Sequence, residues 1–189
     1  SGLEYTATSA AAIRGLNLVG NPFPSAVQWE QGSWNRNNLD YAVYVWDGYK
    51  FLSWNGVTGA LSNGIIPAMQ GFFVKSNAPG GSITIPSDAR MHSVIPFYKE
   101  TAAAENLMKV KMESTSNGSF YDETFIHIRP GTTNGFDATY DAWKIFGSDS
   151  FSQVYSFGGD QSILSINSIP DPAPVTMGFR TGAAGSYKF

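Results

Sequence analysis

The chain has 189 residues, of which 14% are charged and 14% aromatic, and its formal net charge is −3. With 20 glycines, 10 prolines and no cysteine, it has the composition of a turn-rich all-β protein, and disulfides and thiolate metal sites are excluded. The lack of a basic run argues against a nucleic-acid partner, and no apolar run is long enough for a membrane span.

The first half of the chain is predicted to consist of short strands joined by turns. Residues 15–20 alternate as a strand does, and the prolines of Asn21-Pro-Phe-Pro24 end it because proline cannot donate a ladder hydrogen bond. Residues 27–38 carry tryptophans among polar residues and predict a loop or a short helical turn. Two further strands are expected at 72–76 and 82–86.

Between these strands, residues 41–54 predict a β-hairpin. Asp47-Gly48 favours a two-residue type I′ turn, because both central residues of that turn need positive φ. This turn pairs Trp46 with Tyr49, and counting outward makes both faces of the hairpin largely apolar. The hairpin must therefore be covered on both sides, or must offer one face to a ligand.

After residue 98 the pattern changes. Residues 99–105 are small, polar and poor in strand formers, so we expect a linker between an N-terminal lobe, 1–98, and a C-terminal lobe, 106–189. Residues 140–146 fit a strand or a short helix. Other strands of this lobe are expected at 107–113, 121–129, 153–157, 162–167 and 175–180. Short strands with such turns predict an all-β fold of two lobes, each resembling a β-sandwich or jelly roll.

The last residues, 185–189, begin a strand pattern that has no turn or partner after it. We therefore expect the chain to be a piece of a longer protein, with a truncated C-terminal lobe. An open sheet edge of this kind accepts a strand from another protein chain. A protein partner that pairs with this edge is accordingly one prediction.

Several blocks of the sequence resemble β-rich modules of large secreted and cell-surface proteins of Bacteroidetes, which are exported by the type IX secretion system. The resemblance implies an extracellular or cell-surface module, of a kind appended to adhesins and hydrolases, and it supplies no catalytic residues. In the first half the blocks are Gly15-Leu-Asn-Leu-Val-Gly-Asn-Pro-Phe-Pro-Ser25, Val43-Tyr-Val-Trp-Asp-Gly48 and Ile66-Pro-Ala-Met-Gln-Gly-Phe-Phe-Val-Lys75. In the second half they are Asn134-Gly-Phe-Asp-Ala-Thr-Tyr-Asp-Ala-Trp-Lys144, Leu164-Ser-Ile-Asn-Ser-Ile-Pro170 and Val175-Thr-Met-Gly-Phe179.

The sequence offers no recognisable catalytic constellation. The two histidines, His92 and His127, lie far apart, and no serine lies in a Gly-x-Ser-x-Gly motif. Glycosidases need two carboxyl groups facing each other across a sugar, whereas the acids here are scattered and several have turn positions. We therefore predict a non-catalytic structural or adhesion module. The alternatives are a carbohydrate-binding module and, second, a fragment of a polysaccharide-active enzyme.

Asp137 and Asp141 suggest a calcium site. Two carboxylates four residues apart, beside a glycine-containing loop with carbonyl oxygens, supply the hard oxygen ligands that Ca²⁺ prefers. The spacing does not match an EF-hand loop. The structural alternative is that Asp137 caps a turn with its side chain while Asp141 lies on the surface.

Aromatic residues are dense around the hairpin, and sugars stack on exposed aromatic faces. The candidate residues for polysaccharide binding are Trp34, Trp54, Trp29 and Tyr49. Trp34 lies among polar residues and Trp54 precedes Asn55-Gly56, so these two are expected to be the most exposed. The alternative is that the aromatic residues fill the core of a small sandwich, which is the expected place of Trp46.

Overall fold

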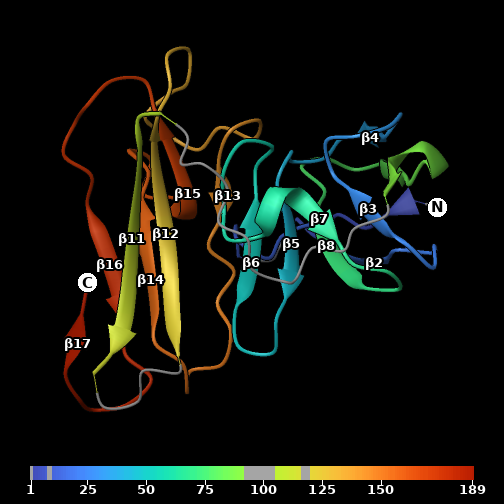
Figure 1. The fold of residues 1–189 in the computed structure, drawn as a ribbon. Helices are drawn as coiled ribbons and strands as arrows, with labels where there is room; N and C mark the ends of the chain where they lie inside the picture. Colours follow the sequence, from blue (N-terminus) through green and yellow to red (C-terminus); the bar gives the residue numbers. More distant parts are fainter. Residues whose placement is uncertain (1, 8–9, 92–104, 116–119) are drawn as a thin grey trace.

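The computed structural model describes residues 2–7, 10–91, 105–115 and 120–189. These residues form strands and turns with no α-helix, so the all-β prediction is confirmed. No helix of this described part is long and apolar enough to cross a membrane. The strands assemble into four sheets, which follow one another across Figure 1 from β16 and β17 at one end to β3 and β4 at the other.

The strands are short in the first half of the chain and longer in the second. The first half contributes β1 (Gly2–Leu3), β2 (Leu16–Gly20), β3 (Ala26–Gln28), β4 (Asn35–Asn37), β5 (Val43–Trp46), β6 (Phe51–Trp54), β7 (Ile65–Ile66), β8 (Gly71–Lys75), β9 (Gly81–Thr84) and β10 (Arg90–Met91). The second half contributes β11 (Leu107–Ser114), β12 (Tyr121–Ile128), β13 (Ala142–Trp143), β14 (Gln153–Phe157), β15 (Ile163–Ile169), β16 (Met177–Arg180) and β17 (Tyr187–Lys188). Short 3₁₀ turns occur at Ser62–Gly64 and Ser87–Ala89.

The sheet at the centre of the molecule is antiparallel, with the strand order β2-β8-β5-β6. Successive side chains of a strand point to opposite faces, so such a sheet can cover a core on each side. On β5, Val43 and Val45 enter one core and Tyr44 enters the other. On β8, Phe72 and Phe73 take opposite sides in the same way. Over most of its length the central hairpin is thus covered on both faces, which is the first of the two arrangements that its apolar residues allow.

The first core lies between the central sheet and two three-stranded sheets, β1-β9-β4 and β10-β3-β7. Trp29 and Phe72 are its largest fully buried aromatic residues, and their ring centroids lie 6.2 Å apart with edge-to-face geometry. Burial of such side chains contributes about 25 cal/mol per Å² of apolar surface. The buried members are Val27, Trp29, Val43, Val45, Trp54, Leu61, Ile66, Phe72, Val74 and Ala89.

The second core lies on the opposite face of the central sheet and joins it to the second half of the chain. Its buried members are Ala42, Tyr44, Phe125, Ala142, Ile145 and Ile166. Because residues from both halves bury one another here, the two predicted lobes share a hydrophobic core. The lobe boundaries stay a prediction, since most of the expected linker, 99–104, lies outside the described residues.

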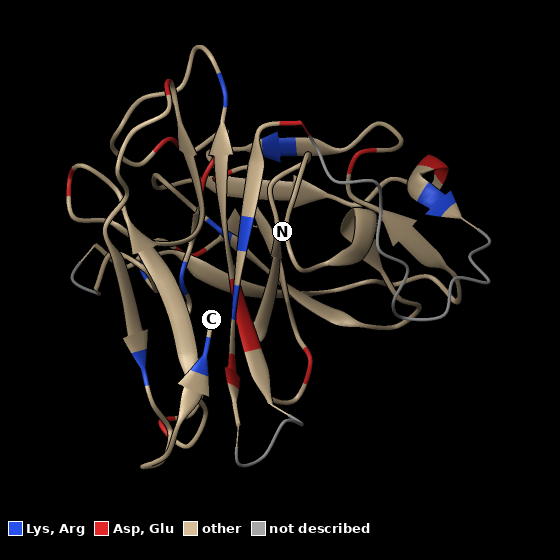
Figure 2. Cartoon of the chain, turned by 60° about the vertical axis from the view of Figure 1, so that its left-hand side comes forward, with Lys and Arg blue, Asp and Glu red and all other residues tan. Residues whose placement is uncertain are grey.

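The second half forms a seven-stranded sheet with the order β16-β14-β15-β12-β11-β17, in which β13 pairs with β15 and the β12–β15 pair is parallel. The sheet curls, so its two ends approach each other on one side of the molecule (Figure 1). Phe179 on β16 and Phe189 beyond β17 lie 5.5 Å apart between ring centroids. Along β11, exposed Lys109 and Lys111 alternate with half-buried Val110 and buried Met112, whereas Met108 is 55% exposed. Figure 2 shows the charged positions of the chain, which are scattered over its strands and loops.

The register of the central hairpin differs from the prediction by two residues. Trp46 pairs with Phe51 and not with Tyr49. The reason is the Asp47 side chain, whose Oδ1 accepts the amide hydrogens of Tyr49 and Lys50, both at 2.8 Å, and so builds a longer loop. A shift of two residues keeps every side chain on its predicted face, so the apolar character of both faces is unaffected.

Two other predictions need correction, and one is narrowed. Residues 27–38 contain most of β3 and all of β4 where a loop or helical turn was expected, because each strand pairs with a sequence-distant partner. Of the two alternatives for residues 140–146, a strand forms, and it is the two-residue β13. The C-terminal strand β17 does have a partner, since its residues pair with the end of β11. A protein partner at a sheet edge stays a prediction.

Candidate functional site

The junction between the two halves is held by polar contacts as well as by the second core. Several hydrogen bonds cross it, and each joins a residue of the 41–55 region to a residue beyond position 120. They are Tyr41 N to the Ala138 carbonyl (2.8 Å), Lys50 Nζ to the Tyr121 carbonyl (2.9 Å), Ser165 Oγ to Ser53 Oγ (3.0 Å), Trp143 N to Tyr44 Oη (2.9 Å) and Asn55 Nδ2 to the Tyr140 carbonyl. The central hairpin therefore fixes the second half both by packing and by directional bonds.

Tyr44 lies at the middle of this junction and is fully buried. Burial, together with the nearby negative charges of Asp40 and Asp141, raises the pKa of the Tyr44 phenol, so the hydroxyl stays protonated. The oxygen accepts the amide hydrogen of Trp143, which belongs to β13. A buried phenol with an apolar ring and one satisfied polar end suits this position between two sheets.

Asp141 is the second buried polar group at the junction, and its side chain is 0% exposed. Its Oδ2 accepts the amide hydrogen of Asp137 at 2.8 Å, and its Oδ1 accepts that of Ser168 at 2.7 Å. Both carboxylate oxygens are therefore used to satisfy backbone donors, one in its own loop and one on β15. The expectation that Asp141 lies on the surface is wrong, because these buried donors need an acceptor.

Asp137 behaves as the turn residue that the structural alternative described. It is partly buried, and its Oδ1 accepts the amide hydrogen of Thr139 at 3.0 Å. The two acids are adjacent, since the Asp137 amide donates to Asp141. The described residues contain no group of three or more His, Cys, Asp or Glu side chains that could hold a metal ion. Calcium binding by Asp137 and Asp141 stays a prediction.

The calcium prediction has a direct thermal test. If Asp137 and Asp141 bind Ca²⁺ only in the folded state, the melting temperature in excess calcium will exceed that in EDTA, and the difference will grow with calcium concentration. Asp137→Asn should abolish the difference, since it removes a charged ligand whose side chain bonds only one exposed amide. Equal melting temperatures with and without calcium contradict the prediction.

The stability contributed by Asp141 is expected to depend on pH. Burial raises the pKa of Asp141 from 3.8 to about 7, against the effect of the two amide hydrogen bonds. A raised pKa in the folded state stabilises the fold fully below the unfolded value, and this contribution is lost as the pH rises to about 7. The stability difference between the wild type and Asp141→Ala should thus be larger at about pH 5 than at about pH 8 in urea titrations. A difference that shrinks on acidification contradicts this assignment.

The tryptophans predicted to face a ligand are used mainly in the first core. Trp29 is fully buried and Trp54 is 7% exposed, so the expectation that Trp54 is exposed is wrong. Trp34 is half-buried, its ring centroid lies 4.8 Å from that of Trp29, and its Nε1 donates to the Gln28 carbonyl at 3.0 Å. The Arg36 guanidinium lies 4.0 Å from the Trp29 ring centroid and 5.3 Å from the Trp34 ring centroid, so a polar neighbour of Trp34 in sequence packs against both indoles.

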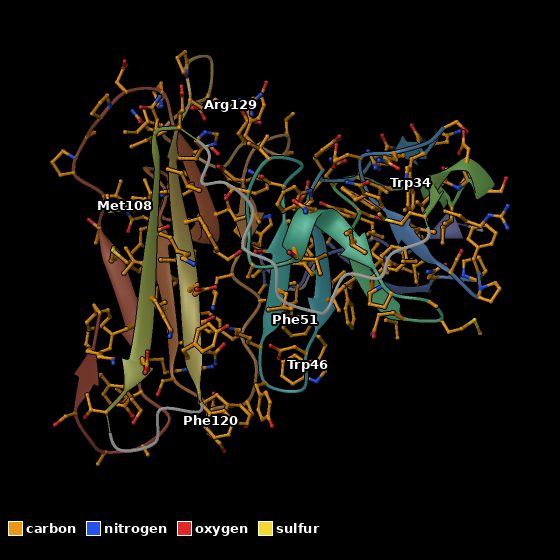
Figure 3. The ribbon with its side chains drawn as sticks, viewed as in Figure 1. Trp34, Trp46, Phe51, Met108, Phe120 and Arg129 are labelled. Carbon is orange, nitrogen blue, oxygen red and sulfur yellow. The ribbon has the colours of Figure 1, made fainter. Side chains whose placement is uncertain are left out.

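Exposed aromatic surface occurs instead at the tip of the central hairpin. Tyr49 is 49% exposed and Trp46 is 36% exposed, although Trp46 was expected to be a core residue. The ring of Tyr49 contacts Phe120 and Phe151 of the second half, with centroids 4.8 and 5.3 Å away. Figure 3 shows Trp46 and Phe120 at the same end of the molecule. We call these four residues the tip aromatics.

The tip aromatics are attached firmly to the second half. Gly147 lies so close to the hairpin that a Cβ atom there would lie 2.7 Å from the Tyr49 carbonyl oxygen and 3.1 Å from Cζ3 of Trp46. The position of Trp46 at the end of β5, directly before the Asp47-Gly48 turn, was the signal that sequence reasoning missed. Of the residues predicted to bind sugar, Tyr49 alone lies with this cluster.

Comparisons with known proteins place the chain near one curated protein. No family model matches it, and no solved structure matches it. The chain is 22% identical, over 219 aligned positions, to the minor fimbrium subunit Mfa5 of Porphyromonas gingivalis, a Bacteroidetes bacterium. The alignment covers 98% of this chain and 18% of that protein, so the chain spans about a fifth of its relative's length. The chain is thus distantly similar, along nearly its whole length, to part of a fimbrium subunit.

Proposed function

We propose that the chain is a non-catalytic structural or adhesion module of a larger extracellular or cell-surface protein from a Bacteroidetes bacterium. The observation that carries this proposal is the similarity to a fimbrium subunit, which runs over 98% of the chain. The partner implied is another protein rather than a small-molecule substrate. A sequence identity of 22% supports a similar general role for the two proteins, and it does not identify a specific ligand.

The architecture suits a module that transmits load or spaces other domains. The first strand, β1, and the last, β17, lie at opposite ends of the molecule (Figure 1). Between them, the central sheet contributes to both hydrophobic cores, and hydrogen bonds cross from the hairpin into the second half. A pull on both ends would therefore have to break the shared core before the halves could separate.

The proposal is tested in the organism that encodes the chain. An in-frame deletion of this segment from the parent gene should reduce adherence or fimbrial assembly while leaving polysaccharide, peptide and ester hydrolysis by the cells unchanged. The purified chain should show no hydrolysis of these substrate classes at high protein concentration. Hydrolysis by the purified chain, or a deletion that abolishes hydrolysis and leaves adherence intact, would favour the enzyme-fragment alternative.

Export by the type IX secretion system is part of this proposal. It is supported by the sequence blocks that resemble modules of type IX-exported proteins and by the similarity to a Bacteroidetes protein. Antibody against the chain should detect the parent protein on intact cells, and inactivation of the type IX machinery should leave it inside them. Surface display that persists without this machinery contradicts the export route but not the module's role.

Carbohydrate binding is the second candidate, and the exposed tip aromatics favour it. Tyr49 and Trp46 present ring surface on which a sugar can stack, and Tyr49 also carries a hydroxyl. If a polysaccharide retards the protein in affinity electrophoresis, replacing both residues with alanine should remove the retardation. Phe179→Ala is the matched control, because this ring is 58% exposed but lies on β16. Retardation that survives the double substitution contradicts binding at the tip.

A further inference from the structure

A lysine and an aspartate lie buried against each other in the second half of the chain. Lys144 directly follows β13, and Asp122 is the second residue of β12. Their side chains are 3% and 4% exposed, and Lys144 Nζ is in direct contact with Asp122 Oδ2. Both strands pair with β15, so a single strand holds the two side chains in place.

Two fully buried apolar side chains flank this pair, and a second buried lysine, Lys50, lies near enough to interact with both charges. Met112 is the cross-strand neighbour of Asp122 on β11, and Val154 donates its amide hydrogen to Asp122 Oδ2 at 2.8 Å. Met112 and Val154 are both 0% exposed. The carboxyl group therefore has one backbone donor and one amine as its polar contacts among the hydrogen bonds of the described residues, within side chains that exclude water.

Burial of this kind is unfavourable for a charged lysine–aspartate pair, but it favours condensation of the amine with the carboxyl group. Removing two charges from water carries a desolvation penalty that their mutual attraction need not repay. Fixed contact between an amine and a carboxyl group replaces a bimolecular encounter, and effective molarities of about 10⁵ M or more are reached in well-oriented intramolecular reactions. Exclusion of water also removes the reagent that would hydrolyse an amide product.

We propose that Lys144 and Asp122 form an intramolecular isopeptide bond. A proton moves from the Lys144 ammonium to the Asp122 carboxylate, which gives a neutral amine and a neutral carboxylic acid. Nζ then attacks Cγ, the bond from Cγ to the hydroxyl oxygen breaks, and that hydroxyl leaves as water with a proton from Nζ. The products are one amide and one water molecule, and no oxidant or cofactor takes part. The bond links β12 to the chain segment after β13.

A second buried pair in the same protein provides the contrast. Lys75 Nζ and Asp40 Oδ2 lie 3.8 Å apart, with side chains 7% and 2% exposed. Burial there is comparable, but the amine is not in contact with the carboxyl oxygen, and Asp40 has Lys75, Asn77 and Trp143 as polar neighbours. Contact geometry, rather than burial alone, therefore separates the two pairs, and only Lys144–Asp122 is expected to condense.

Mass spectrometry of the full chain tests the proposal. The purified protein should be lighter than its sequence mass by one water molecule. After denaturation, cleavage at Glu113 and Glu123 should leave fragment 114–123 attached to fragment 124–189, since the bond joins Asp122 to Lys144. A full sequence mass overturns the proposal. A loss of water with fragment 114–123 released free also overturns it, because the dehydration then lies elsewhere.

Matched substitutions show which amine reacts. Lys144→Arg keeps the positive charge but lacks the reactive amine, so this variant should have its full sequence mass and release fragment 114–123. Lys75→Arg should still lose one water molecule and keep the fragments joined. If Lys75→Arg restores the full mass while Lys144→Arg does not, the assignment to Lys144 is wrong. Because the fragments are analysed after denaturation, the wild-type result decides the question even if a variant folds poorly.

Discussion

Replacing Asp141 with alanine is expected to lower the free energy of unfolding by about 2–6 kcal/mol, because each buried donor left unpaired costs about 1–3 kcal/mol. The donors are the amides of Asp137 and Ser168, at 2.8 and 2.7 Å from the two carboxylate oxygens. Ser168 belongs to β15, the strand that pairs with β12, β13 and β14, so the loss should affect the whole second sheet. Urea titration followed by tryptophan fluorescence at about pH 8, where the Asp141 carboxyl group is ionised and both oxygens are acceptors, measures the change.

Asp137→Ala is the matched control for this substitution. Its side chain accepts one amide hydrogen, that of Thr139, in an exposed setting, so its loss should cost no more than about 1 kcal/mol. Asp141→Asn is the sharper variant. One amide end of asparagine can replace one oxygen, but its NH₂ group then faces a backbone N–H, so most of the destabilisation should remain. Equal stability of Asp141→Asn and wild type contradicts the proposed role.

Most strands of this chain could be predicted from its sequence, because the alternation of apolar and polar residues and the positions of turn-forming residues indicate the same strand boundaries. The strand predicted at 153–157 coincides with β14, and the strand at 107–113 lies within β11. The register of the hairpin could not be predicted, because it depends on which amide hydrogens the Asp47 carboxylate accepts. The preference of Asp-Gly for a type I′ turn concerns only the backbone and does not include this competing side-chain hydrogen bond.

The exposure of the tryptophans could not be predicted from neighbouring residues. Trp34 has polar neighbours in sequence, yet it packs on Trp29 and Phe72 within the first core. The strands that cover it come from distant parts of the chain, since β4 pairs with β9. The polarity of neighbouring residues describes only what is adjacent along the chain. The burial of a side chain depends instead on which strands, far apart in sequence, pair and pack around it.

Asp141 shows the same limit for a candidate metal ligand. Its spacing from Asp137 was visible in the sequence, but the partner that uses its second oxygen is Ser168, 27 residues away. Two acids four residues apart are compatible with a cation site and with a buried acceptor of backbone bonds. Only the fold distinguishes these uses, because the donor on β15 becomes adjacent when β13, which directly follows Asp141, pairs with β15.

Tyr44→Ala is expected to lower the free energy of unfolding by about 3–5 kcal/mol, the range for removing a large buried aromatic side chain. Tyr44 is fully buried in the core shared by the two halves, and its hydroxyl accepts the Trp143 amide at 2.9 Å. The variant therefore loses packing between the central sheet and the second half and leaves a buried donor unpaired. Calorimetry should show one transition in the wild type, since the halves share a core, and a lower or split transition in the variant.

Tyr44→Phe separates the two contributions. It keeps the ring and removes only the acceptor, so a loss of about 1–3 kcal/mol is expected from the unpaired Trp143 amide. Val110→Ala on β11 is the control in the second half, because this half-buried side chain lies outside the shared core and should affect stability less. If Tyr44→Ala leaves one transition at the wild-type temperature, the two halves do not depend on this contact. The central hairpin would then not be the element that couples them.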